Sequence, residues 1–115
     1  MKYAVVGNRV GWSMYDIWNA LDKYKITSAD TIISGGADGV DTFAQEYAKH
    51  IGCKMIIHYP DMKKKSPERY FERNRVIVDE SDIVIAFDRG SSGKTGTANT
   101  TNYAEKIRKE FIVLT

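Results

Sequence analysis

Glycine and small polar residues gather in three segments of the chain, each directly after a short apolar run. The first contains Gly7, Asn8 and Arg9, the second spans residues 34–41, and the third spans residues 89–97. Glycine lets the backbone approach a ligand closely and adopt positive φ, so that successive N–H groups can point at a phosphate. The helix that follows such a loop adds its N-terminal dipole and its unpaired N–H groups. The pattern predicts a phosphate-bearing ligand.

The ligand-binding residues predicted in these segments share this loop chemistry. They are Gly7, Asn8, Arg9, Ser34, Gly35, Gly36, Ala37, Asp41, Gly90, Ser91, Ser92, Gly93, Gly96 and Thr97. We expect the phosphate on the loops at residues 34–37 and 90–97. The guanidinium of Arg9 could meet it with paired hydrogen bonds, and a surface ion pair is the alternative for this residue.

A further polar pair lies later in the chain, at Arg73 and Asn74. Tyr70, Ile77 and Val78 mark the buried face of a predicted helix, and Asn74 falls between them. A buried amide needs hydrogen-bond partners, so we predict that Asn74 anchors a loop or contacts the ligand. Arg73 is adjacent and joins the predicted site, with an ordinary surface position as its alternative.

Several other kinds of site do not fit the sequence. Residues 93–95 resemble the end of a P-loop, but the first glycine of that motif would fall on Asp88. No G-x-G-x-x-G fingerprint follows the first apolar run, which argues against binding NAD by that route. The chain shows no Ser–His–acid set and no metal-ligand spacing, so we expect neither a cofactor nor a metal. If the protein is an enzyme, Asp41 is the candidate catalytic carboxylate.

Five short apolar runs would position the loops, at residues 3–6, 31–33, 54–58, 82–87 and 111–115. Most are continuous rather than alternating, as in strands of a parallel sheet that is covered on both faces. Segments with helical spacing separate them, and right-handed crossovers turn such an alternation into a doubly wound sheet. We therefore predict an α/β, Rossmann-like fold with a parallel five-stranded sheet and helices on both faces.

The positions of the glycine loops predict the strand order. If the first three strands wind outward and the fourth returns beside the first, the order is 3-2-1-4-5. A topological switch point then lies between the first and fourth strands, where open α/β sheets hold ligands at the carboxyl ends of the strands. The loops after the first, second and fourth strands would meet there, whereas the third strand lies at the edge.

The helical segments carry recognisable ends. A capping box is predicted at Ser13, before the first helix. The third helix is predicted to open with Ser66 as its cap and Pro67 at its first position. The fourth is expected over residues 97–109, with Ile107 facing inward.

The bulk properties fit a single domain over residues 1–115, without a run of about 18 apolar residues that could span a membrane. Cys53 is the only cysteine, which excludes an internal disulfide and suits a cytoplasmic protein. A net charge of +2 is too small to imply nucleic-acid binding. We interpret the lysine run at residues 63–65 as a solvated loop rather than a phosphate site.

Together, the motifs resemble the SLOG superfamily, in particular its YspA-like branch. The resemblance covers nearly the whole chain. It rests on Gly7-Asn8-Arg9 with Trp12, residues 34–41, Arg73-Asn74, residues 82–87 and the Gly-Thr pair at 96–97. Residues 34–41 also look like the corresponding segment of the DNA-processing protein DprA. The resemblance implies a Rossmann-like sheet and a nucleotide-type ligand.

One position sets this chain apart from the enzymes of that superfamily. The LOG enzymes, which cleave the N-glycosidic bond of cytokinin nucleoside monophosphates, have a Pro-Gly-Gly-x-Gly-Thr-x-x-Glu signature. Here Thr100 stands at the glutamate position. The loss of that carboxylate removes the acid–base group that the hydrolysis needs.

We therefore favour a sensor or carrier module that binds a nucleotide or a nucleotide-derived small molecule. A LOG-like hydrolase that uses Asp41 is one alternative, and a DprA-like module associated with DNA is another. Nucleic acid is the less favoured partner, no membrane partner is expected, and a homo-oligomer stays open.

Overall fold

The computed structural model describes residues 1–89 and 96–115. Its strands are β1 (Lys2–Gly7), β2 (Thr31–Ser34), β3 (Lys54–Ile57), β4 (Ile83–Phe87) and β5 (Glu110–Leu114). Its helices are α1 (Met14–Asp22), α2 (Val40–Ile51), α3 (Glu68–Glu80) and α4 (Gly96–Lys106). None of the described helices combines the length and the apolar character that crossing a membrane requires.

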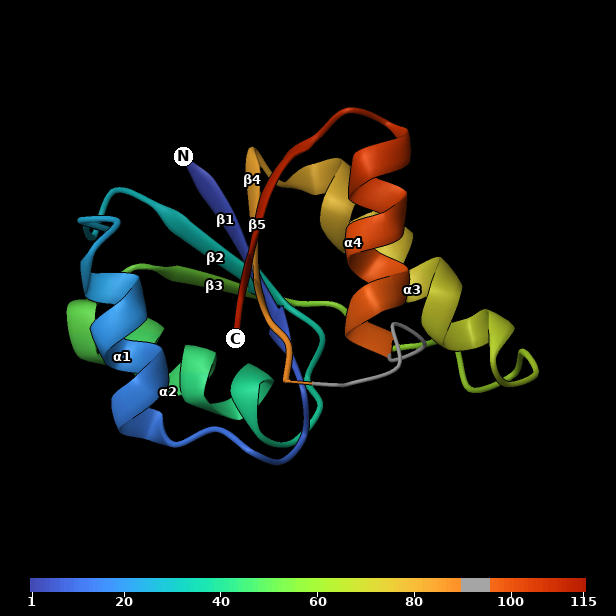
Figure 1. The fold of residues 1–115 in the computed structure, drawn as a ribbon, viewed down its shortest axis with the longest axis horizontal. Coiled ribbons are helices and arrows are strands. Elements are labelled where there is room, and N and C mark those ends of the chain that lie inside the picture. The colour runs from blue at the N-terminus through green and yellow to red at the C-terminus, as the bar shows by residue number, and fades with distance from the viewer. Residues whose placement is uncertain (90–95) are drawn as a thin grey trace.

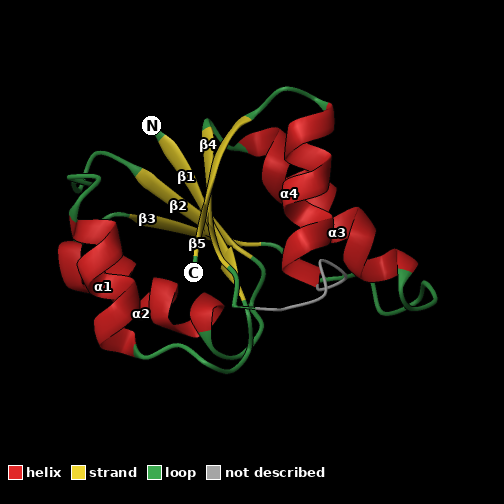
Figure 2. Ribbon diagram, in the orientation of Figure 1, coloured by secondary structure: helices red, strands yellow, loops and turns green. Residues whose placement is uncertain are grey.

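The strands form one parallel sheet in the order β3-β2-β1-β4-β5. This order confirms the predicted fold class and topology. In the centre, β1 pairs with β2 on one side and, from Tyr3↔Ile83 to Gly7↔Phe87, with β4 on the other. Figures 1 and 2 show α1 and α2 on one face of the sheet and α3 and α4 on the other. The switch point between β1 and β4 therefore lies between two pairs of helices.

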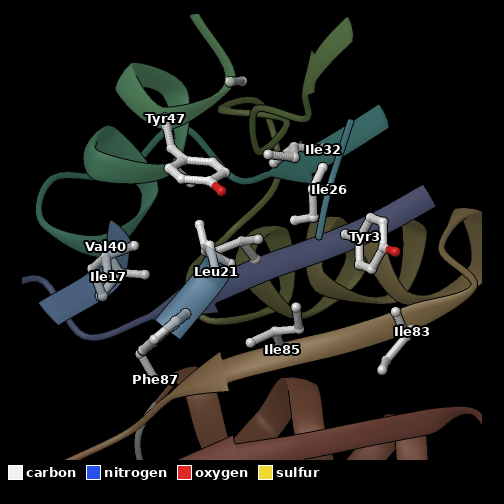
Figure 3. Packing of buried hydrophobic residues seen from close by; sticks show 13 residues of the cluster. Tyr3, Ile17, Leu21, Ile26, Ile32, Val40, Tyr47, Ile83, Ile85 and Phe87 are labelled. Carbon is white, nitrogen blue, oxygen red and sulfur yellow. The ribbon is translucent and has the colours of Figure 1, made fainter. Parts of the chain in front are cut away.

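Each face of the sheet packs its own hydrophobic cluster. The cluster under α1 and α2 is shown in Figure 3, and its strand residues include Tyr3, Val5, Ile32, Ile83, Ile85 and Phe87. The cluster under α3 and α4 uses the alternate residues Ala4, Val6, Ile33, Val84 and Ala86. Successive side chains of a strand point to opposite faces, which is why the central strands are apolar throughout. Fully burying each large aliphatic or aromatic side chain contributes about 1.5–3 kcal/mol.

The helices on the first face begin in different ways. The Ser13 hydroxyl accepts a hydrogen bond from the Asp16 amide at 3.0 Å, and the Asp16 carboxylate accepts one from the Ser13 amide at 3.1 Å, which confirms the capping box. α2 has no side-chain cap, because Gly39 precedes it with φ 76° and ψ −123°. A Cβ on Gly39 would lie 2.6 Å from the carbonyl carbon of Arg9. The start of α2 is therefore fixed by contact with the loop after β1.

The helices on the second face differ from the prediction at their ends. Ser66 does not cap α3, because the helix begins at Glu68 and Pro67 occupies the N-cap position without a side-chain hydrogen bond. α4 ends at Lys106, and Ile107 is 40% exposed instead of inward. Arg108, two residues after the end of α4, has a φ of 60°, which is not helical. The prediction that Ile107 faces inward assumed a helix that continues to residue 109.

Candidate functional site

A pocket of about 450 Å³ lies at the carboxyl edge of the sheet. It is enclosed by the end of β1, the loops after β1 and β2, one side of α3 and the start of α4. Its lining residues are Val6, Gly7, Asn8, Arg9, Gly35, Ala37, Asp41, Pro67, Tyr70, Phe71, Arg73, Asn74, Ile77, Gly96, Thr97 and Thr100. A concave site of several hundred Å³ is typical for small molecules.

The structure brings most of the predicted site residues to this pocket. Those that line it are Gly7, Asn8, Arg9, Gly35, Ala37, Asp41, Arg73, Asn74, Gly96 and Thr97. Ser34 and Gly36 lie beside it without lining it. Gly90, Ser91, Ser92 and Gly93 lie outside the described residues.

The Asn8 side chain holds the loop after β1 to the end of β4. Its Oδ1 accepts hydrogen bonds from the Arg89 amide at 2.7 Å and from Trp12 Nε1 at 3.2 Å. Its Nδ2 donates to Asp88 at 3.2 Å. Arg89 also lies 3.7 Å above the Trp12 ring. These bonds occupy most of the hydrogen-bonding capacity of Asn8, so its main contribution to the pocket is to position the loop that carries Arg9.

Asp41, in the first turn of α2, is only 5% exposed although it lines the pocket. Its Oδ2 accepts a hydrogen bond from the Ala37 amide at 3.1 Å. Burial raises the pKa of Asp41, and the Ala37 amide and the Arg73 guanidinium partly oppose that shift. The Ala37 amide, which belongs to the loop predicted to hold the phosphate, is therefore engaged by the Asp41 carboxylate.

Gly35 and Gly36, the first two glycines of this loop, face different surroundings. A Cβ on Gly35 would lie 2.7 Å from Arg73 Nη1 and 3.1 Å from Asp41 Oδ2, at the polar side of the pocket. Gly36 has a φ of 73°, and a Cβ there would lie 2.6 Å from the Tyr59 ring. Gly35 is therefore the glycine that keeps the space between the two charged groups open, while Gly36 makes the turn.

Arg73 and Asn74 join α3 to its neighbours. Arg73 Nη1 donates to the carbonyl of Gly35 at 2.5 Å, and its Nε donates to Asn74 Oδ1 at 3.0 Å. Asn74 is 6% exposed, and its Nδ2 donates to the Asn99 carboxamide at 3.2 Å and to the Gly96 carbonyl at 3.5 Å. The pair thus ties the loop after β2 to the start of α4, with α3 between them.

Arg9 differs from Arg73 in having no partner among the described residues. It is exposed at the pocket and makes no hydrogen bond or ion pair with any residue in 1–89 or 96–115. Its charge lies near enough to Arg73 to lower the pKa of that guanidinium, together with burial, which is the larger cause. Two cations therefore line the pocket near each other, and of the two only the Arg73 side chain makes contacts with the described residues.

The apolar wall of the pocket comes from α3 and the residue before it, and its Tyr70 ring lies beside the Arg73 guanidinium, 5.9 Å from ring centroid to Cζ. Its members are Pro67, Tyr70, Phe71 and Ile77. The helical period of the sequence predicts Tyr70 and Ile77 as core positions, but it does not show that these side chains line a pocket. The sequence did not predict Pro67 and Phe71 as pocket residues. Whether a face of α3 is left uncovered depends on the distance of α4 and of the loop after β1, and the sequence of α3 does not show that distance.

Thr100, which the resemblance to the LOG enzymes aligns with their glutamate, is 2% exposed. Its hydroxyl donates to the Gly96 carbonyl at 3.2 Å, within α4. Among the described residues, no group of three or more His, Cys, Asp and Glu side chains gathers in a way that could hold a metal ion. Asp41 is therefore the one carboxylate among the described residues that line the pocket.

Comparison with known proteins adds to this geometry. The sequence model of the family described as "YspA, cpYpsA-related SLOG family" matches residues 1–64. The X-ray structure of TM1055 is similar, with a TM-score of 0.68 and 21% identity, over 96% of this chain and 72% of that one. DNA processing protein A (DprA) from Streptococcus pneumoniae is similar with a TM-score of 0.61 and 17% identity, over 96% of this chain and 58% of that one. No curated protein matches the sequence significantly.

Proposed function

Because the chain belongs to the YspA, cpYpsA-related SLOG family, we propose that it binds a nucleotide or nucleotide-derived molecule in the pocket at the carboxyl edge of its sheet. The family and the fold support a nucleotide-related or DNA-associated module. The nucleotide itself, and a role as sensor or carrier, are our proposal.

The two walls of the pocket suit the two ends of a nucleotide. Pro67, Tyr70 and Phe71 offer an apolar and aromatic surface for a base. Arg9 offers a phosphate a cation that has no partner among the described residues, and its planar guanidinium can bind two phosphate oxygens at once. The observation that carries the proposal is this arginine, unpaired among the described residues, in a pocket that also has an aromatic wall.

The position of Asp41 constrains where the phosphate lies. Its carboxylate accepts the Ala37 amide and would repel a phosphate placed on the loop at residues 34–37. We therefore place the phosphate nearer to Arg9 and to the start of α4, where Gly96 and Thr97 line the pocket and the helix dipole is positive.

Substitution of Arg9 tests this placement. We expect the native protein to bind nucleoside 5′-monophosphates in isothermal titration, and Arg9→Gln to weaken binding about tenfold or more, as for loss of a charged hydrogen bond. Lys54→Gln, at the opposite edge of the sheet, is the matched control and should leave the affinity unchanged. If no nucleotide binds to the native protein, or if Arg9→Gln binds as well as native, the proposal is wrong.

A hydrolase that releases the base is the alternative, and it makes a different prediction. We expect no appreciable release of free base from nucleoside monophosphates, since Thr100 cannot act as acid or base and Asp41 is buried and engaged by the Ala37 amide. A chromatographic assay of native protein beside Asp41→Asn decides between them. Turnover in the native protein that disappears in Asp41→Asn would establish the enzyme instead of the binding module.

A further inference from the structure

A second hollow, of about 640 Å³, lies next to the candidate pocket. We call it the lysine groove, and its lining residues are Lys63, Lys64, Lys65, Glu68, Phe71, Glu72 and Arg75. Phe71 lines both the pocket and the groove. The two hollows are therefore neighbours along α3, and Phe71 is the residue that they share.

The groove carries more positive charge than its own carboxylates balance. Lys64 forms an ion pair with Glu72. The side chains of Lys63, Lys65 and Arg75 form no ion pair with any described residue. Glu68 is the remaining carboxylate of the groove, so one negative charge is left to balance these three positive charges. The groove thus presents an unbalanced cationic surface that continues from one wall of the pocket.

We propose that the ligand is a phosphodiester-linked nucleotide, with one nucleotide in the pocket and the next phosphate over the lysine groove. The inference rests on the proposed function, because it needs the first nucleotide in the pocket. A dinucleotide and the 5′ end of a single strand both supply this chemistry.

Phe71 and the free cations together form the combination that binds single-stranded nucleotides. Cations follow the phosphates, and an aromatic side chain stacks on a base and tolerates any base, since every base has a π-face. Arg75 lies one helical turn after Phe71 on the same side of α3, so the aromatic and cationic groups form one continuous surface. The net charge of +2 for the whole chain concealed this local concentration.

The test compares ligands of increasing length. Adenosine 5′-monophosphate, ATP, the dinucleotide pApA and a 5′-phosphorylated hexa-adenylate are titrated against native protein, a Lys63→Gln/Lys65→Gln/Arg75→Gln variant and a control variant. The control is Lys2→Gln/Lys49→Gln/Lys54→Gln, which removes the same charge from exposed positions at the amino ends of β1 and β3 and in the last turn of α2. Melting curves confirm that each variant is folded.

We expect pApA to bind the native protein about tenfold or more tightly than the monophosphate, and the groove variant to lose that gain while its affinity for the monophosphate is unchanged. For hexa-adenylate, the slope of log affinity against log salt should fall in magnitude by about 2 in the groove variant alone. A gain that ends at pApA identifies a dinucleotide ligand, and a gain that continues to hexa-adenylate identifies a strand end.

Other results would overturn the inference. Equal affinities for monophosphate and pApA would leave the proposed function in place without the groove. An equal gain for ATP would show that any added phosphate is enough and that no phosphodiester link is recognised. If the groove variant and the control variant lost the same affinity for pApA, the effect would come from the net charge of the protein and not from the lysine groove. Failure of the monophosphate itself to bind would remove the proposed function as well.

Discussion

Replacing Gly39 with alanine is expected to lower the free energy of unfolding by about 3 kcal/mol or more and the melting temperature by roughly 10 °C. Two costs combine at this position. The backbone at φ 76° and ψ −123° lies outside the region that L-residues adopt. The added Cβ would also lie 2.6 Å from the carbonyl carbon of Arg9 and 2.7 Å from its Cα. The atoms that the new Cβ would meet belong to the backbone of Arg9, so they can move away only if the whole loop after β1 shifts.

Gly52→Ala is the matched control for this prediction. Gly52, after α2, has a similar φ of 75° but lies in the left-handed helical region with ψ 25°. A Cβ there meets nothing within 4 Å. We expect it to cost about 1 kcal/mol from backbone strain alone. Thermal or denaturant unfolding compares the two variants, and equal destabilisation would show that the contact between the loops has no energetic weight.

Replacing Arg73 with methionine is expected to destabilise the protein by about 2–3 kcal/mol at neutral pH. Breaking a fully buried ion pair costs about 3–5 kcal/mol, and the loss here is smaller because Arg73 is only partly buried. The substitution leaves the carboxylate of Asp41 buried without its nearby cation and removes the donor to the Gly35 carbonyl. Nucleotide affinity should fall with it, since the loop after β2 loses its tie to α3.

The pH dependence of this effect separates the loss of charge from the loss of packing. Burial raises the pKa of Asp41 above its ordinary value of 3.8, so the folded protein binds a proton more readily than the unfolded chain. Without Arg73 the pKa of Asp41 should rise further. The stability difference between Arg73→Met and native protein should therefore shrink as the pH falls through this raised pKa and the carboxyl becomes neutral. Denaturant unfolding across this pH range is the measurement, with Arg75→Met as control, and a constant difference would attribute the loss to packing alone.

The topology could be predicted because the evidence for it is local and redundant. Residues 83–87 are apolar on both alternating sets, a pattern that a strand covered on two faces requires. Three glycine loops at one edge then left a single order that brings them together. Helix ends were less predictable, as Ser66 and Ile107 show. The position of a cap or of a last turn depends on contacts with residues that are distant in the sequence.

The site could be predicted in part. Loop residues such as Gly35 and Asp41 could be predicted as site residues from their residue types alone, and the topology brings them to one pocket. What each does there depends on atoms from distant segments. Asn8 was predicted to meet the ligand, yet its amide is engaged by Asp88 and Arg89, which are 80 and 81 residues away. The apolar wall was missed because Phe71 has no chemistry of its own until the packing leaves it uncovered.

The pocket is shared between two halves of the chain, and this division has a consequence for base preference. The segment that matches the family, residues 1–64, supplies the loops with Arg9 and Asp41, whereas the aromatic wall and the start of α4 follow that segment. On the proposed function, substitutions at Phe71 or Tyr70 should alter which base fits while the loops after β1 and β2 are retained. The base preference of this chain would then depend on one helix, separately from the segment that the family model matches.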